Sequence, residues 1–205
     1  MSRTDPIMPP DVDILSTETC YQGFFRIDRY RLRHRLFKGG WSRPLTREVF
    51  ERGHAVAVLP YDPQRDEVVL IEQFRIGALA AHDHAWLLEI AAGIIEPGED
   101  PLHVAHREVR EETGCIIETL QPICTFYCSP GGTSETIALY CACVDASGCS
   151  GIHGLADEGE DIRVSAIPFS RAVELLEQGR LNSASIIIAL QWLMQQRDRL
   201  RKEWG

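Results

Sequence analysis

Hydrophobic and polar residues alternate along the N-terminal part of the chain, in a pattern typical of strands with one covered face. Between Gly23 and Phe37, apolar side chains occupy one parity and arginines occupy the other. The apolar members are Phe24, Tyr30, Leu32 and Leu36, and the basic members are Arg29, Arg31, Arg33 and Arg35. Lys38-Gly39-Gly40 indicates a turn, and residues 45–50 can form the return strand. We therefore predict a small antiparallel sheet region over residues 1–53, which begins with a frayed arm of about 15 residues.

The arginine row has two interpretations. One face of a strand that carries only long charged side chains is usually a solvated surface. The same row could instead bind phosphate or contact another subunit. The pattern favours the solvated face and leaves the other two roles open.

Continuous apolar runs follow, and they are typical of buried strands. HAVAVL over residues 54–59 and VVLIEQF over residues 68–74 are separated by a segment dense in turn-forming residues. We predict that they form a hairpin with a long loop. WLLEI over residues 86–90 predicts a further strand.

A helix is predicted next. Asp100 can cap it, and Pro101 suits its first position, where a missing N–H costs little. Gly114 is the usual type of residue for a left-handed helix end, so the helix should run to Thr113.

The C-terminal part mixes strands and helices. We expect strands over residues 123–127, 136–144 and 163–167, and helices over residues 170–178 and 184–202. Residues 147–161, between the second and third of these strands, form a polar segment that contains several glycines. Strands with helices between and after them indicate an α/β (α+β) fold, a layered α/β/α sandwich with a mixed sheet over residues 54–205.

Composition narrows the function. The chain has 205 residues, of which 44% are hydrophobic, and this suffices for one core with a small accessory unit. Thirty acidic and 21 basic residues give a net charge of -9, which argues against nucleic acid as a partner. An anionic small substrate still fits, because a metal ion or a few arginines reverse the local charge.

The cysteines and the termini suggest an ordinary intracellular protein. Seven cysteines form no CxxC pair and no zinc-type spacing, so we expect reduced thiols. Those in CTFYC and YCACV are expected to be small buried hydrophobes. MSRTDPIMPP lacks the apolar core of a signal peptide, and SIIIALQWLM is too short to span a bilayer. We expect a cytoplasmic protein with no membrane partner.

Three glutamates crowd one turn of the predicted helix. Glu108, Glu111 and Glu112 stand at i, i+3 and i+4, on neighbouring faces. Like charges at this spacing repel by only about 0.2–0.5 kcal/mol per pair, which is too little to demand a metal ion. Taken alone, the cluster is better explained as a solvated helix face.

The wider spacing changes that interpretation. Gly93 is followed after five residues by Glu99, and after seven more by Arg107-Glu108, with Glu111-Glu112 and Gly114 completing the pattern. Seven such positions coincide by chance with a frequency on the order of 10⁻⁸ per starting point. The pattern resembles the Nudix box, the signature of the Nudix hydrolases, and departs from it at Cys115, where an aliphatic residue is usual.

The resemblance implies a magnesium site. Mg²⁺ prefers oxygen ligands and binds through a few carboxylates together with substrate phosphates and water. Glu108, Glu112 and the backbone carbonyl of Ala92 would be ligands. Glu99, Arg107 and Glu111 would orient them, although Glu111 could bind a metal directly. Two or three ions per site are expected, and Mn²⁺ could replace Mg²⁺.

Further segments resemble the Nudix subgroup that cleaves ADP-ribose and related ADP-sugars. Pro130, in the turn-like CSPGGTSE, lies sixteen residues beyond Gly114. LADEGED, at residues 155–161, carries four acidic residues and is by composition a flexible acidic loop. The resemblance makes it a loop over the pyrophosphate, with Glu158 as the general base and Glu160 as a further metal ligand.

The resemblance also implies substrate contacts and a homodimer. Phe24 would stack on adenine with Arg47 on its other face, although a core Phe and a surface Arg are the plainer alternatives. Arg75 would reach a phosphate. Weaker candidates for substrate contact are Glu48, Arg52, Ser129 and Glu135.

The expected reaction is Mg²⁺-dependent hydrolysis of ADP-ribose to AMP and ribose 5-phosphate. One alternative is a pyrophosphatase for another nucleotide sugar, such as ADP-glucose or GDP-mannose. Another is a non-catalytic sensor of ADP-ribose, which the intact set of glutamates argues against.

Overall fold

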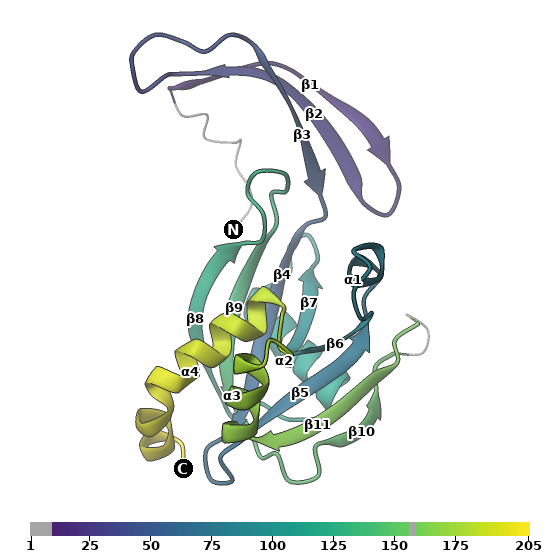
Figure 1. The fold of residues 1–205 in the computed structure, drawn as a ribbon, viewed down its shortest axis with the longest axis vertical. Helices are drawn as coiled ribbons and strands as arrows, with labels where there is room; N and C mark the ends of the chain where they lie inside the picture. The colour runs from purple at the N-terminus through teal and green to yellow at the C-terminus, as the bar shows by residue number, and fades with distance from the viewer. Residues whose placement is uncertain (1–9, 156–158) are drawn as a thin grey trace. The chain divides into compact units, whose positions relative to one another are not determined.

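A computed structural model describes residues 10–155 and 159–205 (Figure 1). The chain divides into two compact units. The first comprises the residues up to His54 together with Glu96–Gly98 and Tyr127–Thr136. The second comprises Ala55–Ile95, Glu99–Phe126 and Ile137–Gly205. None of the described helices is both long and apolar enough to cross a membrane.

The first unit is built on a three-stranded antiparallel sheet in the order β1-β2-β3. Its strands are β1 (Val12–Gln22), β2 (Arg26–His34) and β3 (Leu45–Glu51). The predicted hairpin is confirmed in β2 and β3. The predicted frayed arm is wrong from Val12 onward, where β1 begins. Most of β1 is exposed, so its polar sequence carries no alternation that would have indicated a strand.

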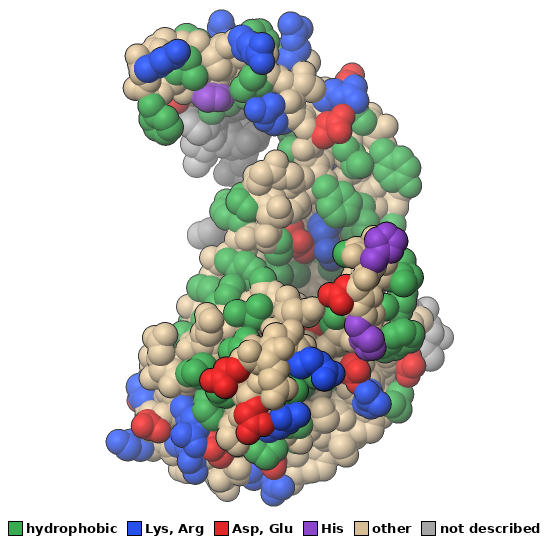
Figure 2. Space-filling view, viewed as in Figure 1, with side chains coloured by type: hydrophobic (Ala, Val, Ile, Leu, Met, Phe, Trp, Pro, Cys, Tyr) green, Lys and Arg blue, Asp and Glu red, His purple; other side chains and the backbone are tan. Residues whose placement is uncertain are grey.

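The arginine row lies on an exposed face of the sheet. Arg29 of β2 forms ion pairs with Glu18 of β1 at 2.8 Å and with Glu48 of β3 at 2.9 Å. Arg33 pairs with Asp13 of β1 at 2.8 Å. Several Lys and Arg side chains cover the visible face of this unit in Figure 2. These cross-strand pairs support the interpretation as a solvated, charged face.

The second unit contains an eight-stranded mixed sheet, in the order β10-β11-β5-β4-β9-β8, with β6 on β5 and β7 on β4. The strands are β4 (His54–Asp62), β5 (Glu67–Phe74), β6 (Trp86–Glu89), β7 (Ala91–Ile95), β8 (Thr119–Tyr127), β9 (Thr136–Cys143), β10 (Ser150–His153) and β11 (Ile162–Pro168). β4 pairs parallel with β9, whereas β4 and β5 are antiparallel. The helices are α1 (Ile76–Ala80), α2 (Pro101–Thr113), α3 (Phe169–Glu177) and α4 (Ala184–Glu203).

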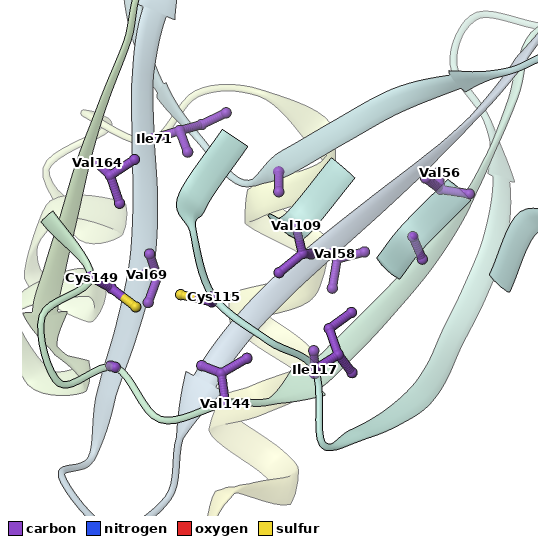
Figure 3. Close-up of a cluster of buried hydrophobic side chains, with 14 of the residues drawn as sticks. Val56, Val58, Val69, Ile71, Val109, Cys115, Ile117, Val144, Cys149 and Val164 are labelled. Carbon is purple, nitrogen blue, oxygen red and sulfur yellow. The ribbon is translucent and has the colours of Figure 1, made fainter. Parts of the chain in front are cut away.

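The sheet is buried on both faces. Val56 and Val58 of β4 pack with Val109 of α2 on one face (Figure 3). The intervening Ala57 and Leu59 belong to the opposite cluster, with residues of α3 and α4. A strand covered on both sides needs no polar alternation, which explains the continuous run HAVAVL. The predicted α/β/α sandwich with a mixed sheet is confirmed.

Three short elements were not predicted. α1 has only five residues, too few to show a helical period. β7 follows β6 after one residue, so the two read as one apolar run. β10 lies within the glycine-rich segment that was expected to be irregular, and it pairs with β11.

The cysteine prediction is half correct. Cys141 and Cys143 of β9 are buried, as expected from YCACV. Cys124 and Cys128 of CTFYC are exposed. β8 stands at the end of the strand order, so a side chain there need not be covered by a neighbouring strand.

Asp66 joins the turn between β4 and β5 to α4. Its backbone is left-handed, with φ of 58°. Arg197 of α4 donates from Nε to Oδ1 at 2.7 Å and from Nη2 to Oδ2, and the buried Tyr61 hydroxyl donates to Oδ1 at 2.9 Å. Hydrogen bonding from Arg197 lowers the pKa of Asp66 below its usual value.

Asp66→Asn is expected to destabilise the protein by about 1.5–3 kcal/mol at neutral pH. Asn tolerates the left-handed backbone and keeps an acceptor, so the change removes mainly the charge. A lowered folded-state pKa means that this contribution is present above about pH 4 and is lost as pH falls through the folded pKa. Urea unfolding should show a smaller difference in free energy of unfolding between wild type and Asp66→Asn at pH 3 than at pH 7. Asp198→Asn is the matched control, because Asp198 is exposed and lies 3.9 Å from Arg197; an equal effect of both variants would contradict the assignment.

Candidate active site

Helix α2 begins and ends where its sequence predicts. The Asp100 carboxylate accepts from the backbone N–H of Leu102 at 2.9 Å, and Pro101 is the first helical residue. Gly114 closes the helix in the left-handed conformation, with φ of 72°. These two caps set where the helix begins and ends, and packing of its apolar residues Val104, Ala105 and Val109 in the core sets which way its glutamates point.

The three glutamates of α2 have different environments. Glu108 is 9% exposed and Glu112 is 2% exposed, so both face the sheet. Glu111 is only partly covered, with 31% of its side chain exposed. The interpretation as a solvated helix face is therefore wrong for Glu108 and Glu112. Two buried carboxylates on adjacent turns are costly without a cation or hydrogen bonds, which makes them unusual for a purely structural helix.

Gly93 of β7 provides the space for Glu108. A Cβ atom at residue 93 would lie 2.0 Å from Cδ and from Oε1 of the Glu108 carboxylate. Any side chain there would displace the carboxylate or the strand. The glycine of the motif therefore has a steric role: it lets the carboxylate lie directly against the backbone of β7.

Glu112 is held by the neighbouring residue of the same strand. The backbone N–H of Ala92 donates to Oε2 of Glu112 at 2.9 Å. The pKa of Glu112 is raised to about 8, chiefly by burial and also by the negative charges of Glu108 and Glu160, while the hydrogen bond from Ala92 and the charge of Arg75 act in the opposite direction. Acidic charge is thus concentrated at a buried position, which is typical of functional sites.

Arg107 links the other acidic residues of the motif. Its Nη1 lies 2.9 Å from Glu108 Oε1 and 3.5 Å from Glu111 Oε2. Its Nη2 lies 3.7 Å from Glu99 Oε2. The residues expected to orient the ligands are therefore brought together at Arg107, which also contacts Glu108.

Arg75 follows β5 and is paired with a residue that the sequence did not single out. Its Nε lies 2.6 Å from Oε2 of Glu89 on β6. Among the described residues this pair occupies Nε alone, which leaves the terminal amino groups for an anionic ligand. Gln73, two residues earlier, has a buried Nε2 with no hydrogen-bond partner in the described part of the chain. The available signal for Glu89 was its position as the one polar residue of the otherwise apolar β6.

The acidic loop before β11 is described only in part. Glu160 lies at its end, where its Oε2 accepts from the backbone N–H of Leu155 at 3.1 Å. The Glu160 N–H donates to the carbonyl oxygen of Leu155 at 3.2 Å, so the two residues close the base of the loop. Glu158, the predicted general base, lies outside the described residues.

The residues present fit a hard divalent cation. Glu108 and Glu112 supply two carboxylates beside the backbone of Ala92, and Mg²⁺ typically takes one or two carboxylates with water and substrate phosphates. Within residues 10–155 and 159–205, no group of three or more His, Cys, Asp or Glu side chains could hold a metal ion. Water and a phosphate ligand would therefore have to supply the rest of the coordination shell around an ion held by Glu108 and Glu112.

The remaining candidates lie in the first unit. Phe24 is 89% exposed and has an edge contact with Phe25, at 4.8 Å between ring centroids. The Arg52 guanidinium lies over the Phe25 ring at 5.3 Å, and Arg52 Nε lies 3.3 Å from Oε1 of the buried Glu135. Arg52 and Glu135 are thus paired with each other, while the Phe24 ring is presented to solvent.

Three other candidates in this unit have internal partners. Arg47 of β3 donates to the backbone oxygen of Thr46 at 2.8 Å, and Glu48 pairs with Arg29. The carbonyl oxygen of Ser129 accepts from Gly132 and Thr133, each at 3.0 Å, which makes the segment around Pro130 a turn. The sequence prediction of a turn there is confirmed.

Comparison with known proteins agrees with these features. Residues 51–187 match the NUDIX domain family. The chain is 52% identical over 195 residues to an ADP-ribose pyrophosphatase of Escherichia coli K12, covering 95% of this chain and 93% of the relative. A second ADP-ribose pyrophosphatase, from Haemophilus influenzae, is 41% identical, covering 100% of this chain and 95% of the relative. A GDP-mannose pyrophosphatase of Cronobacter sakazakii is 35% identical, covering 72% and 76%.

The fold has a solved counterpart. A crystal structure named for an ADP compounds hydrolase superposes with a TM-score of 0.68 at 24% identity, covering 91% of this chain and 96% of the other. At that identity the match supports the fold alone. With a family match over most of the chain and relatives above 40% identity along nearly its full length, the chain belongs to the Nudix hydrolase family.

Proposed function

We propose that the protein hydrolyses the diphosphate of ADP-ribose to AMP and ribose 5-phosphate, and that it requires a divalent cation. The observation that carries the proposal is the pair of buried carboxylates, Glu108 and Glu112, set against the backbone of Ala92 and Gly93. The 52% identity to an ADP-ribose pyrophosphatase over 95% of the chain supports this substrate.

The proposed residues divide the work. Glu108, Glu112 and the Ala92 carbonyl would hold the cation, with Glu160 as a further ligand and with Glu99, Arg107 and Glu111 orienting the set. The cation would lower the pKa of bound water and offset negative charge on the diphosphate. Arg75 would donate to a phosphate oxygen, where negative charge develops as the bond to the leaving phosphate breaks.

Proton transfer is assigned to Glu158. The attacking water forms a bond to one phosphorus through its oxygen, the bridging P–O bond of the diphosphate breaks, and the water proton passes to the Glu158 carboxylate. A carboxylate is a weak base at its ordinary pKa, so position matters more than basicity here.

Substrate recognition is assigned to the first unit. Phe24 would stack on adenine and Arg47 would cover the other face of the base. The exposed ring of Phe24 is available for such a contact. Ser129 and Pro130, in their turn, and Glu48, Arg52 and Glu135 are proposed as further substrate contacts.

We also propose Mg²⁺ as the physiological ion, two or three per site, with Mn²⁺ as a substitute. Residues 1–53 would form a dimerisation region of a homodimer, with residues 54–205 as the catalytic domain. Sedimentation of the purified protein tests the dimer, and a metal titration of activity tests the ion.

The test of function is hydrolysis in H₂¹⁸O with Mg²⁺, comparing kcat/KM for ADP-ribose, ADP-glucose and GDP-mannose. We expect the highest value for ADP-ribose, with ¹⁸O entering one of the two monophosphate products. A higher kcat/KM for GDP-mannose would mean that the chain acts as a GDP-mannose pyrophosphatase, the activity in the name of its 35% identical relative. Binding of ADP-ribose without release of AMP would favour the sensor.

Glu158→Gln is expected to lower kcat by about 10²–10⁴-fold, because general-base catalysis contributes on this scale. KM should change much less, since the side chain is not assigned to binding. Glu174→Gln, at a solvent-exposed ion pair on α3, is the control. Near wild-type kcat in Glu158→Gln would rule out the assignment.

Glu89→Gln is expected to raise KM for ADP-ribose by about 10-fold or more, because loss of a positioning partner typically costs 10–100-fold. The amide oxygen can still accept from Nε of Arg75, but without the charge of a carboxylate the hydrogen bond is weaker, so the guanidinium is held less firmly in its orientation. Glu72→Gln is the matched control, because Glu72 lies on the adjacent strand and pairs with Arg163 instead.

Steady-state kinetics and thermal unfolding separate the outcomes for Glu89. A purely structural role would lower the unfolding temperature of Glu89→Gln and leave KM unchanged. Partial recovery of KM in Glu89→Asp, which retains the charge, is expected if the residue acts through Arg75.

A further inference from the structure

Two cysteine thiols face each other below the C-terminal end of α2. Cys115 directly follows the helix-ending Gly114, and Cys149 precedes β10. Both belong to the hydrophobic cluster that α2 covers, and their sulfur atoms point toward each other in Figure 3. Burial, and next the neighbouring Cys115 thiol, raise the pKa of Cys149. They come from segments 34 residues apart in the sequence, so their proximity is a product of the fold.

Both cysteines have restrained backbones. The N–H of Cys115 donates to the Thr113 hydroxyl at 3.2 Å, and the N–H of Cys149 donates to the carbonyl oxygen of Ala146 at 3.1 Å. The Cys149 thiol also donates to the carbonyl oxygen of Asp145 at 3.5 Å. The Cys115 thiol likewise donates to the carbonyl oxygen of Thr113 at 3.9 Å, so each thiol has a contact that restricts its rotation.

A cavity gives small molecules access to the pair. It has a volume of about 490 Å³, and Cys115, Cys149, Gly114 and His153 are among its lining residues. The side chains of Cys115 and Cys149 are 2% and 9% exposed, so access is restricted to small reagents.

We propose that Cys115 and Cys149 form a dithiol site, which closes to an intramolecular disulfide when a small diffusible disulfide enters the cavity. One cysteine attacks the reagent, forms a mixed disulfide and releases one thiol. The second cysteine then attacks the mixed disulfide and releases the other thiol, and the two protein protons end on the two released thiols. The new bond joins the end of α2 to the segment that enters β10.

The buried setting determines the rate. Burial raises the pKa of Cys149 to about 12, and because the thiolate is the nucleophile the exchange is slow near neutral pH. Long incubation with excess reagent is therefore required. Bis(2-hydroxyethyl) disulfide is a suitable probe, because it is small and its product thiol is stable.

The test uses intact-mass measurement of the full chain with the exposed Cys20, Cys124 and Cys128 replaced by Ser. Closure removes two hydrogens, so we expect a mass decrease of about 2 Da, reversed by dithiothreitol. Digestion without reduction should yield one cross-linked peptide containing both Cys115 and Cys149. Circular dichroism confirms that the starting variant is folded.

Two further variants in this background locate the bond. Cys149→Ser should abolish the mass decrease, whereas Cys143→Ser, at a different buried cysteine, should retain it. The same protein in denaturant serves as the positive control for the reagent. An unchanged mass in the folded protein, stable mixed disulfides on separate cysteines, or a Cys141–Cys143 cross-link would each overturn the proposal.

Discussion

Glu112→Gln is expected to remove most hydrolase activity while the metal-free protein stays folded. A bound cation contributes several kcal/mol of charge stabilisation, so losing one of the two buried carboxylates proposed to hold it should lower kcat/KM by roughly 10²–10³-fold. The amide oxygen of Gln can still accept from the N–H of Ala92, which preserves the contact between α2 and β7. Activity with a Mg²⁺ titration measures the loss, and Glu174→Gln, at an exposed residue, is the control.

The same variant separates function from stability through its pH dependence. Glu112 has a folded-state pKa of about 8, raised from an ordinary value of 4.5 chiefly by burial. Between these values the metal-free folded protein keeps a proton that the unfolded chain loses, so its stability falls as pH rises. The variant lacks this dependence. Its unfolding temperature relative to wild type should therefore increase from pH 5 to pH 9.

With Mg²⁺ added at high pH, the unfolding temperature of wild type should exceed that of Glu112→Gln. A ligand that binds the folded state stabilises it, and only wild type retains the complete set of carboxylates. Equal stabilisation of both proteins by Mg²⁺, together with wild-type activity of the variant, would mean that Glu112 is not a ligand.

Local signals in the sequence were sufficient for α2. The cap residues Asp100 and Gly114 predict both ends of the helix, because each satisfies backbone groups in a way that few residue types can. The sequence shows which positions of α2 carry charge, but it does not show that two of them are buried. Repulsion between the glutamates amounts to only tenths of a kcal/mol, so it does not distinguish a solvated helix face from a buried site. Only the glycine and glutamate upstream, Gly93 and Glu99, carried that information.

Tertiary partners were harder to predict. Glu89 was overlooked because its partner Arg75 lies fourteen residues away on the preceding segment. The pair of Cys115 and Cys149 was overlooked because two β-strands separate the residues in sequence. Strand β1 was missed because its exposed residues show no alternation. In each case the feature depends on contacts between segments that are separated in the sequence. Neither the residue types nor the local hydrophobic periodicity predicts such contacts.

Gly93→Ala is expected to lower kcat/KM by about 10–100-fold, although residue 93 contributes no side chain to the site. The added methyl group would overlap the Glu108 carboxylate, at 2.0 Å from Cδ, so the carboxylate must move away from its position. Overpacking of this kind also costs about 1–3 kcal/mol of stability. Gly77→Ala is the matched control: a Cβ added there would meet no atom of the described residues within 4 Å apart from its chain neighbours and the backbone of its own helix, α1.

A double-mutant cycle shows whether the effect of Gly93→Ala is transmitted by Glu108. In the wild-type background the methyl group displaces a carboxylate that the proposed site needs. In a Glu108→Ala background the same methyl group meets empty space, so it should leave the residual activity unchanged and should no longer destabilise the protein. Additive losses in kcat/KM would instead mean that the methyl group acts on β7 itself. Non-additivity would establish that the glycine of the motif serves to seat one carboxylate against the strand.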